Sequence, residues 1–264
     1  MATFITSDGV GLHYTDDGDG PPVVLLAGFC APLQSWEFQR RALLDAGRRV
    51  IALDRRSHGI SDNVSHGQRL ARHGADLREL LDHLEIPETA VAGQSMGASV
   101  IWAYYDLFGA DRLRAIVTID QTPRMINDDS WQFGFYNLSN GDIGTFFDHG
   151  IPQTGRGKAD RLTGFRKLEA LLGYDPPFGD PADPPLRALL QDHAAQDWRD
   201  VVARVSVPSL FLAARDSQLW PCEHAAWATS VNASASAVTL EDCGHAMCVD
   251  QPDAVSAAMV EFLR

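Results

Sequence analysis

A serine between two glycines is the clearest chemical motif in the chain. Residues 93–97 read Gly-Gln-Ser-Met-Gly, with a short β-like run before them and a helix-forming run after them. So tight a turn from strand to helix strains the backbone of its central residue and leaves no room for side chains on either side. It also exposes the Ser95 hydroxyl at a helix N-terminus, where free N–H groups favour developing negative charge. The pattern predicts that Ser95 is a nucleophile.

A serine hydroxyl needs a base, and the base needs a group that orients it. His245 ends the run Asp-Cys-Gly-His, after the last expected strand and before the last helix. Asp216 follows the apolar run 210–214 in the same way. Both then lie at the carboxyl edge of a parallel sheet, where open α/β sheets build their sites. We predict that His245 is the general base and that Asp216 orients it, in the chain order Ser, Asp, His expected for such a site.

Short apolar runs predict the strands that must hold these residues. The runs are 23–27, 49–53, 89–92, 113–119, 208–214 and 237–240. Helical patterns lie between or after them, at about 33–46, 66–84, 98–108 and 252–263. A hairpin is expected near residues 4–15, around Ser-Asp-Gly. Strands that are apolar on both faces and alternate with helices predict an α/β fold with a mostly parallel, doubly wound sheet.

The alternation stops between about residues 121 and 199. This segment shows no clear strand, but it is rich in aromatic residues and contains short helical patterns and a Pro/Gly-rich run. A structureless loop of that length inside a compact domain is improbable. We therefore expect a helical cap over 121–199, inserted into a core formed by 1–120 and 200–264. The aromatic residues that we predict to line a pocket are Trp36, Trp131, Phe135 and Tyr136.

Composition narrows the class of partner. The chain has 264 residues and a net charge of −13, so its average field repels a nucleic-acid backbone. Four cysteines without a Cys-x-x-Cys spacing give no support for a metal site. No signal peptide or membrane-spanning segment is recognisable. We expect a cytoplasmic protein that acts on a small molecule without a metal or cofactor; whether it forms a homo-oligomer is left open.

With these motifs the chain resembles the α/β-hydrolase superfamily. Within it, the chain is similar to small cytoplasmic esterases, lactonases and cofactor-free haloperoxidase-like enzymes, or perhydrolases. The matching segments are 25–29, 52–62, the Ser95 turn, 208–216 and 244–245. The resemblance implies an oxyanion hole formed by the backbone N–H groups of Phe29 and Met96.

Two positions depart from the family pattern. Ala27 stands where most relatives have histidine, and Ser57 stands where many have glycine. Because backbone groups supply the donors of the oxyanion hole, the loss of the histidine need not abolish it. The loss does change what can brace the loop that carries Phe29.

Together these residues predict two-step acyl transfer on a carboxylic ester or lactone. Three alternatives stay open. A perhydrolase would use peroxide in place of water in the second step. A C–C bond hydrolase or cofactor-free dioxygenase would use His245 mainly on the substrate. A non-catalytic ligand-binding module could share the fold, because a fold does not by itself imply a reaction.

Overall fold

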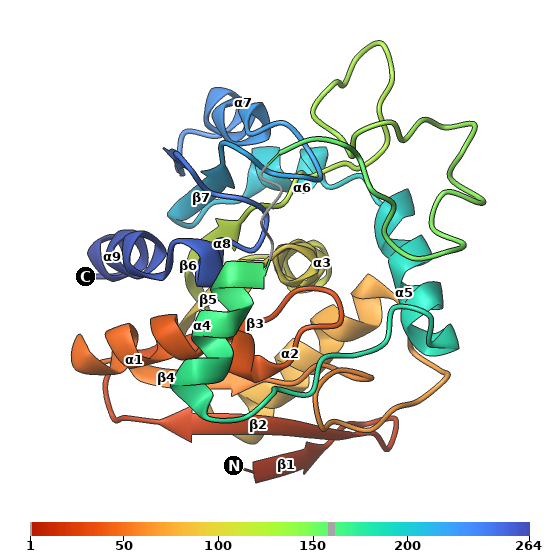
Figure 1. Ribbon diagram of the computed structural model, residues 1–264. Helices are drawn as coiled ribbons and strands as arrows, with labels where there is room; N and C mark the ends of the chain where they lie inside the picture. Colours follow the sequence, from red (N-terminus) through yellow and green to blue (C-terminus); the bar gives the residue numbers. More distant parts are fainter. Residues whose placement is uncertain (1, 158–161) are drawn as a thin grey trace.

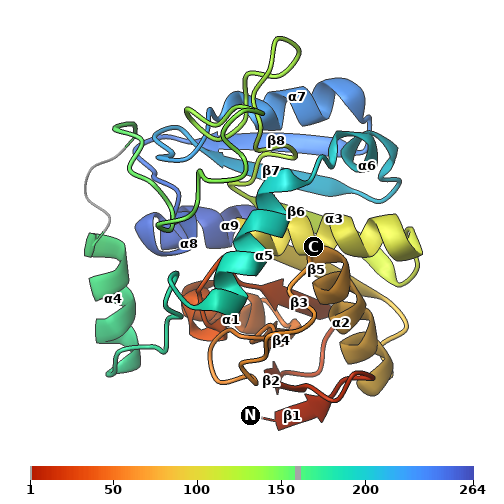
Figure 2. The same ribbon diagram turned by 90° about the vertical axis from the view of Figure 1, so that its right-hand side faces the viewer.

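The computed structural model describes residues 2–157 and 162–264, and in this part of the chain an eight-stranded sheet runs through the centre (Figures 1 and 2). The strands are β1 (Ala2–Ile5), β2 (Gly11–Asp17), β3 (Pro22–Leu26), β4 (Arg49–Leu53), β5 (Thr89–Gln94), β6 (Leu113–Ile119), β7 (Ser209–Ala214) and β8 (Ala235–Leu240). Their order in the sheet is β1-β2-β4-β3-β5-β6-β7-β8. The β1–β2 and β2–β4 pairs are antiparallel and the remaining pairs are parallel. The predicted α/β fold and its mostly parallel sheet are confirmed.

Helices cover both faces of the sheet. The 3-10 helix η1 (Leu33–Trp36), α1 (Glu37–Asp45) and α9 (Pro252–Phe262) pack on one face. On the other face lie α2 (Leu70–His83), α3 (Met96–Phe108), α6 (Arg199–Arg204) and α7 (Glu223–Val231). Both faces of the parallel strands are therefore buried, which explains why these strands are apolar throughout instead of alternating. Helix α7 and the short α8 (Met247–Asp250) were not predicted from the sequence.

Between β6 and β7 the chain leaves the sheet. It forms α4 (Leu162–Leu172) and α5 (Pro184–Ala195) before α6 leads back to β7. Helix α4 packs against α8, and α5 packs against α2; in Figure 2, α5 crosses in front of the central part of the molecule and α4 stands to its left. Residues 158–161, which belong to the predicted cap, lie outside the described residues. The division of the chain into a core and a cap at 121–199 stays a prediction.

The turn between β5 and α3 shows why glycines flank Ser95. The Ser95 backbone has φ 53° and ψ −128°, a strained conformation for a residue with a side chain. A methyl group at Gly93 would collide with the backbone of Gly97, and one at Gly97 would collide with the carbonyl of Leu26. Only glycine lets the first turn of α3 lie this close to β5 and β3.

We predict that Gly93→Ala lowers the free energy of unfolding by about 3 kcal/mol, because the added methyl group has no space and must displace backbone atoms. Gly144→Ala is the matched control, since a methyl group there meets no atom within 4 Å. The control should stay within about 1 kcal/mol of the wild type. Urea unfolding of the three proteins measures both values, and a Gly93→Ala protein as stable as the control would contradict the steric account.

Candidate active site

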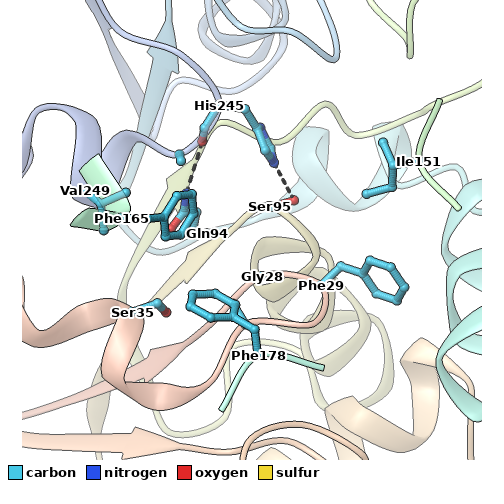
Figure 3. Close-up of a pocket in the computed structure, with 12 residues that line it drawn as sticks. Gly28, Phe29, Ser35, Gln94, Ser95, Ile151, Phe165, Phe178, His245 and Val249 are labelled. Atoms are coloured by element: carbon cyan, nitrogen blue, oxygen red, sulfur yellow. Dashed lines mark hydrogen bonds between the residues drawn. The ribbon is translucent and has the colours of Figure 1, made fainter. Parts of the chain in front are cut away.

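Ser95 and His245 face each other at the carboxyl edge of the sheet (Figure 3). Ser95 lies on the turn between β5 and α3, and His245 lies on the loop between β8 and α8. The Nε2 atom of His245 is 2.9 Å from the Ser95 hydroxyl oxygen. The structure thus brings together the two residues that the sequence motifs singled out, at a distance that allows direct proton transfer.

The carboxylate that contacts His245 belongs to Asp120, not to Asp216. His245 Nδ1 is 2.7 Å from Asp120 Oδ2, and because a carboxylate only accepts, Nδ1 carries the proton. Nε2 is then the acceptor for the Ser95 hydroxyl. In the described part of the chain no hydrogen bond links Asp216 to the His245 ring; the Asp216 backbone N–H donates to the carbonyl of Cys243. The prediction that Asp216 orients His245 was wrong.

The order of the strands explains the correction. Strands β6 and β7 are neighbours, and each is followed by an aspartate at the same edge of the sheet. Strand β6 lies directly beside β5, so Asp120 is one strand away from Ser95, whereas Asp216 is two strands away. The sequence does contain the signal, because Asp120 follows the apolar run 113–119 immediately.

Three hydrogen bonds hold the carboxylate of Asp120 in place. Its Oδ1 accepts the Ala214 N–H at 3.0 Å, and its Oδ2 accepts the Ser217 hydroxyl at 2.7 Å as well as the His245 ring. Burial alone would raise the pKa of this carboxyl group, but His224 and His245 outweigh it and bring the pKa to about 2. The His224 ring lies 4.0 Å away, beyond hydrogen-bond distance. Asp120 is therefore ionised at neutral pH and fixes the tautomer of His245.

The loop that carries His245 is fixed through its backbone. Gln218 Oε1 accepts the His245 N–H at 2.8 Å, and Asp250 Oδ2 accepts the Gly244 N–H at 3.1 Å. Gln94 Nε2 donates to the His245 carbonyl at 3.1 Å, so the residue before Ser95 ties the two loops together (Figure 3). With the backbone and Nδ1 both held, the ring has little freedom to turn away from Ser95.

The backbone N–H groups of Phe29 and Met96, the predicted donors of an oxyanion hole, belong to two segments that adjoin Ser95. Met96 is the first residue of α3, so its N–H has no intrahelical partner. The loop before Phe29 lies against Ser95, because a methyl group at Gly28 would be 3.3 Å from the Ser95 β-carbon. Among the described residues neither N–H group donates a hydrogen bond to protein. Their role as donors to a substrate stays a proposal.

Two cavities of unequal size meet at Ser95. The larger one has a volume of about 210 Å³, and its apolar walls include Phe29, Ile151, Phe165, Phe178 and Val249 (Figure 3). The smaller one has about 20 Å³, room for about one water-sized group. Its walls include Phe135, Phe147, Leu190, His193, Leu219 and Trp220. A molecule bound at Ser95 therefore has far more room on one side than on the other.

Of the four predicted pocket residues, only Phe135 lines a cavity at Ser95. Trp36 is fully buried in the core cluster between the sheet, α1 and α9. Trp131 packs edge-on against Trp227, and Tyr136 borders a separate surface depression. The prediction that these three line the pocket was wrong.

The sequence reasoning missed His193 and the apolar residues Ile151, Phe165, Phe178 and Val249 of the larger cavity. His193 is buried on α5, and burial, Arg55 and His245 lower its pKa to about 3, so its ring is neutral. Helical periodicity cannot identify such residues, because they depend on how α4 and α5 pack on the core.

The described residues contain no cluster of side chains that could hold a metal ion, and their four cysteines are buried. No helix in that part of the chain is long and apolar enough to cross a membrane.

Comparison with known proteins identifies the family. The family model described as the alpha/beta hydrolase fold matches residues 21–252. Because the match covers most of the chain and the sheet, turn and site agree with it, the chain belongs to the α/β-hydrolase family. Its relatives include enzymes of several kinds, which supports an enzyme here as well.

Two relatives show how far the similarity reaches. The chain is 38% identical over 123 residues to the non-heme chloroperoxidase CPO-A1 of Kitasatospora aureofaciens, a match over 47% of this chain and 45% of that protein. It thus spans less than half the length of that relative. It is 26% identical over 279 residues to a non-heme haloperoxidase of Rhodococcus erythropolis, and this match covers 98% of both chains.

Solved structures agree on the fold. A bromoperoxidase from Bacillus anthracis has a TM-score of 0.81 and 22% identity, with 99% of both chains covered. An esterase from Exiguobacterium antarcticum has the same TM-score and identity, with 100% of this chain and 99% of the other covered. At this identity the likeness concerns the fold alone.

We predict that the Nδ1 proton of His245 gives a low-field ¹H NMR signal, because it is held in a short hydrogen bond to a buried carboxylate. The signal should disappear in Asp120→Asn and persist in Asp216→Asn, the matched control. Loss of the signal in Asp216→Asn alone would restore Asp216 as the partner of His245.

Proposed function

We propose that this chain is a serine hydrolase that cleaves a carboxylic ester or lactone through an acyl-enzyme. One observation carries the proposal: the unbroken hydrogen-bonded chain from Ser95 Oγ through His245 to Asp120, with distances of 2.9 and 2.7 Å. A nucleophile, a base and an orienting carboxylate in this arrangement activate a hydroxyl group for attack on a carbonyl carbon.

In the first step the Ser95 oxygen would form a bond to the carbonyl carbon while its proton moves to His245 Nε2. The carbonyl oxygen becomes an anion, which the N–H groups of Phe29 and Met96 would hold. The buried charge of Asp120 stabilises the imidazolium. Collapse of the intermediate breaks the bond from carbon to the alcohol oxygen, and His245 gives its proton to that oxygen.

In the second step water would replace the alcohol. His245 takes a proton from the water as its oxygen attacks the acyl carbon, and a second oxyanion forms in the same place. When this intermediate collapses, the bond to Ser95 breaks and His245 returns the proton to the serine oxygen. The acid leaves, and Asp120 stays ionised throughout because its pKa is about 2.

The two cavities indicate the shape of the substrate. Apolar walls around the larger cavity favour an apolar group, since burying it removes apolar surface from water. The smaller cavity has room for only a very small group. We infer an ester or lactone with one bulky apolar part and one short part.

Perhydrolysis is the second candidate, and the relative of full length named as a non-heme haloperoxidase favours it. In that reaction hydrogen peroxide would take the place of water in the second step and release a peracid. The same Ser95, His245 and Asp120 would serve both reactions, so the residues alone do not choose between them.

We predict that Ser95→Ala, His245→Ala and the double variant all lose ester turnover by a similar factor, on the order of 10⁶, because the two residues act as a unit. Asp120→Asn should lose about 10⁴-fold, because the imidazole then takes the wrong tautomer. Asp216→Asn, the matched control, should keep its activity. Steady-state kinetics on short-chain and longer-chain p-nitrophenyl esters measures these values.

A Ser95→Ala enzyme within about tenfold of the wild type would contradict the acyl-enzyme mechanism, since the loss would be only about 1.4 kcal/mol in the barrier. If His245→Ala is inactive in the same experiment, His245 acts on the substrate directly. That result would favour the C–C bond hydrolase or the cofactor-free dioxygenase.

We predict that water outcompetes peroxide as the acceptor. In water with an ester substrate and a series of millimolar peroxide concentrations, the carboxylic acid should remain the main product. Separating acid from peracid by chromatography measures the partition. Peracid as the main product at millimolar peroxide would establish the perhydrolase instead.

A further inference from the structure

Arg55 is a buried cation that contacts Gly28 and the side chain of Met96, which adjoin the two donor N–H groups of the candidate oxyanion hole. It follows β4 and is 2% exposed. Its Nη2 donates to the Gly28 carbonyl at 2.8 Å and to His58 Nε2 at 2.9 Å. Its Nη1 donates to His73 Nδ1 at 3.1 Å and to the Met96 sulfur at 3.6 Å. The guanidinium thus contacts one residue from each side of the candidate oxyanion hole.

The contact with Gly28 acts on an oxyanion-hole donor through a single peptide group. The carbonyl of Gly28 and the N–H of Phe29 belong to the same peptide bond, and the described residues contain no cis peptide. In a trans peptide the C=O and N–H groups point in opposite directions. Holding the carbonyl from below therefore fixes the direction of the Phe29 N–H. A cation on the carbonyl oxygen also polarises the peptide, which makes the N–H a stronger donor.

The charge of Arg55 is not neutralised by its contacts. Burial and the charge of Arg55 hold the pKa values of His58 and His73 well below their usual range, so both rings are neutral acceptors. The neighbouring carboxylates serve other groups: Asp54 accepts the N–H of Leu33 at 2.6 Å, and Asp76 accepts from Arg56. Burial lowers the pKa of Arg55 to about 10, so the side chain stays protonated at neutral pH.

A buried cation without a direct carboxylate partner is costly, and the nearby charges of Asp54 and Asp76 offset only part of that cost. The side chain before Gly28 offers no other brace, because Ala27 has only a methyl group. An anion that forms at the Ser95 carbonyl adduct would lie on the far side of the peptide that Arg55 holds. In a site shielded from water, a fixed positive charge stabilises such an anion more strongly than it could in solvent.

We propose that Arg55 is a positioning residue of the oxyanion hole: it orients the Gly28–Phe29 peptide and supplies the positive field that stabilises the oxyanion. The inference rests on the proposed function, because it assigns a role in the same acyl-transfer site. Arg55 should therefore strengthen the binding of the transition state and leave the binding of the neutral substrate unchanged.

The first test uses butylboronic acid, which needs no turnover. Its boron binds the Ser95 oxygen, the serine proton passes to His245, and the tetrahedral adduct carries a negative charge like that of the intermediate. We expect Arg55→Met to weaken this binding by about 10²-fold, the effect of losing an oxyanion-hole donor. Arg55→Lys, which keeps the charge but loses the forked hydrogen bonds, should lose less. Ser95→Ala confirms that the adduct forms at Ser95.

The second test measures ester kinetics on the same proteins. Arg55→Met should lower kcat by about 10²-fold with KM changed by less than about threefold. Arg56→Lys is the matched control, because Arg56 is also buried in this turn but pairs with Asp76 and does not contact the Gly28 loop. Its boronate affinity and its kcat per folded molecule should equal those of the wild type. Thermal melting identifies the folded fraction of each variant.

Wild-type boronate affinity in folded Arg55→Met would overturn the proposed role of Arg55. An equal loss of boronate affinity in Arg56→Lys would overturn it as well. If Arg55→Met does not fold, Arg55→Lys is the test variant. Unchanged boronate affinity and kcat in Arg55→Lys would contradict the proposal that the forked contact of Arg55 orients the Gly28–Phe29 peptide. Failure of the proposed function looks different: wild-type protein would bind boronate at Ser95 without cleaving any ester, while the effect of Arg55 on the boronate would still be measured.

Discussion

The close approach of Gly93 and Gly97 is the constraint on which the site depends. It lets α3 begin directly against the sheet, with Ser95 strained at φ 53° and its hydroxyl outside the strand end. The same contact places the first N–H of α3 beside the loop after β3. Because neither glycine can carry a side chain, the packing of the core and the geometry of Ser95 are determined together.

Two buried charges of opposite sign lie on either side of this turn. Asp120 accepts hydrogen bonds from Ala214, Ser217 and His245, and its low pKa keeps it ionised. Arg55 donates to neutral groups beneath the loop of Gly28. One charge suits an imidazolium and the other suits an oxyanion, and these are the two charges that acyl transfer creates at the same moment. Both are held in place before the reaction, so little reorganisation is needed.

The helices between β6 and β7 contribute walls and no part of this charge arrangement. Phe165 from α4 borders the larger cavity, and Leu190 and His193 from α5 border the smaller one. Under the proposed function, the chemistry would depend on the sheet edge, and the choice of substrate would depend on how α4 and α5 pack over it. Such a division allows one catalytic arrangement to serve different substrates in related proteins.

The sequence by itself determined the fold class, the parallel strands, Ser95 and His245, because each depends on short stretches of chain with a strong local pattern. The glycine-flanked serine and the runs of apolar residues need no distant contact to be recognised. The choice of Asp120 over Asp216 depended on strand order, since both aspartates follow apolar strands and only β6 lies beside β5. Likewise Trp36 and Trp131 look like pocket residues in the sequence, but packing placed them away from Ser95 and brought His193 and Phe178 toward it. Only the tertiary structure decides such questions, because residues far apart in the chain compete for the same space around one hydroxyl group.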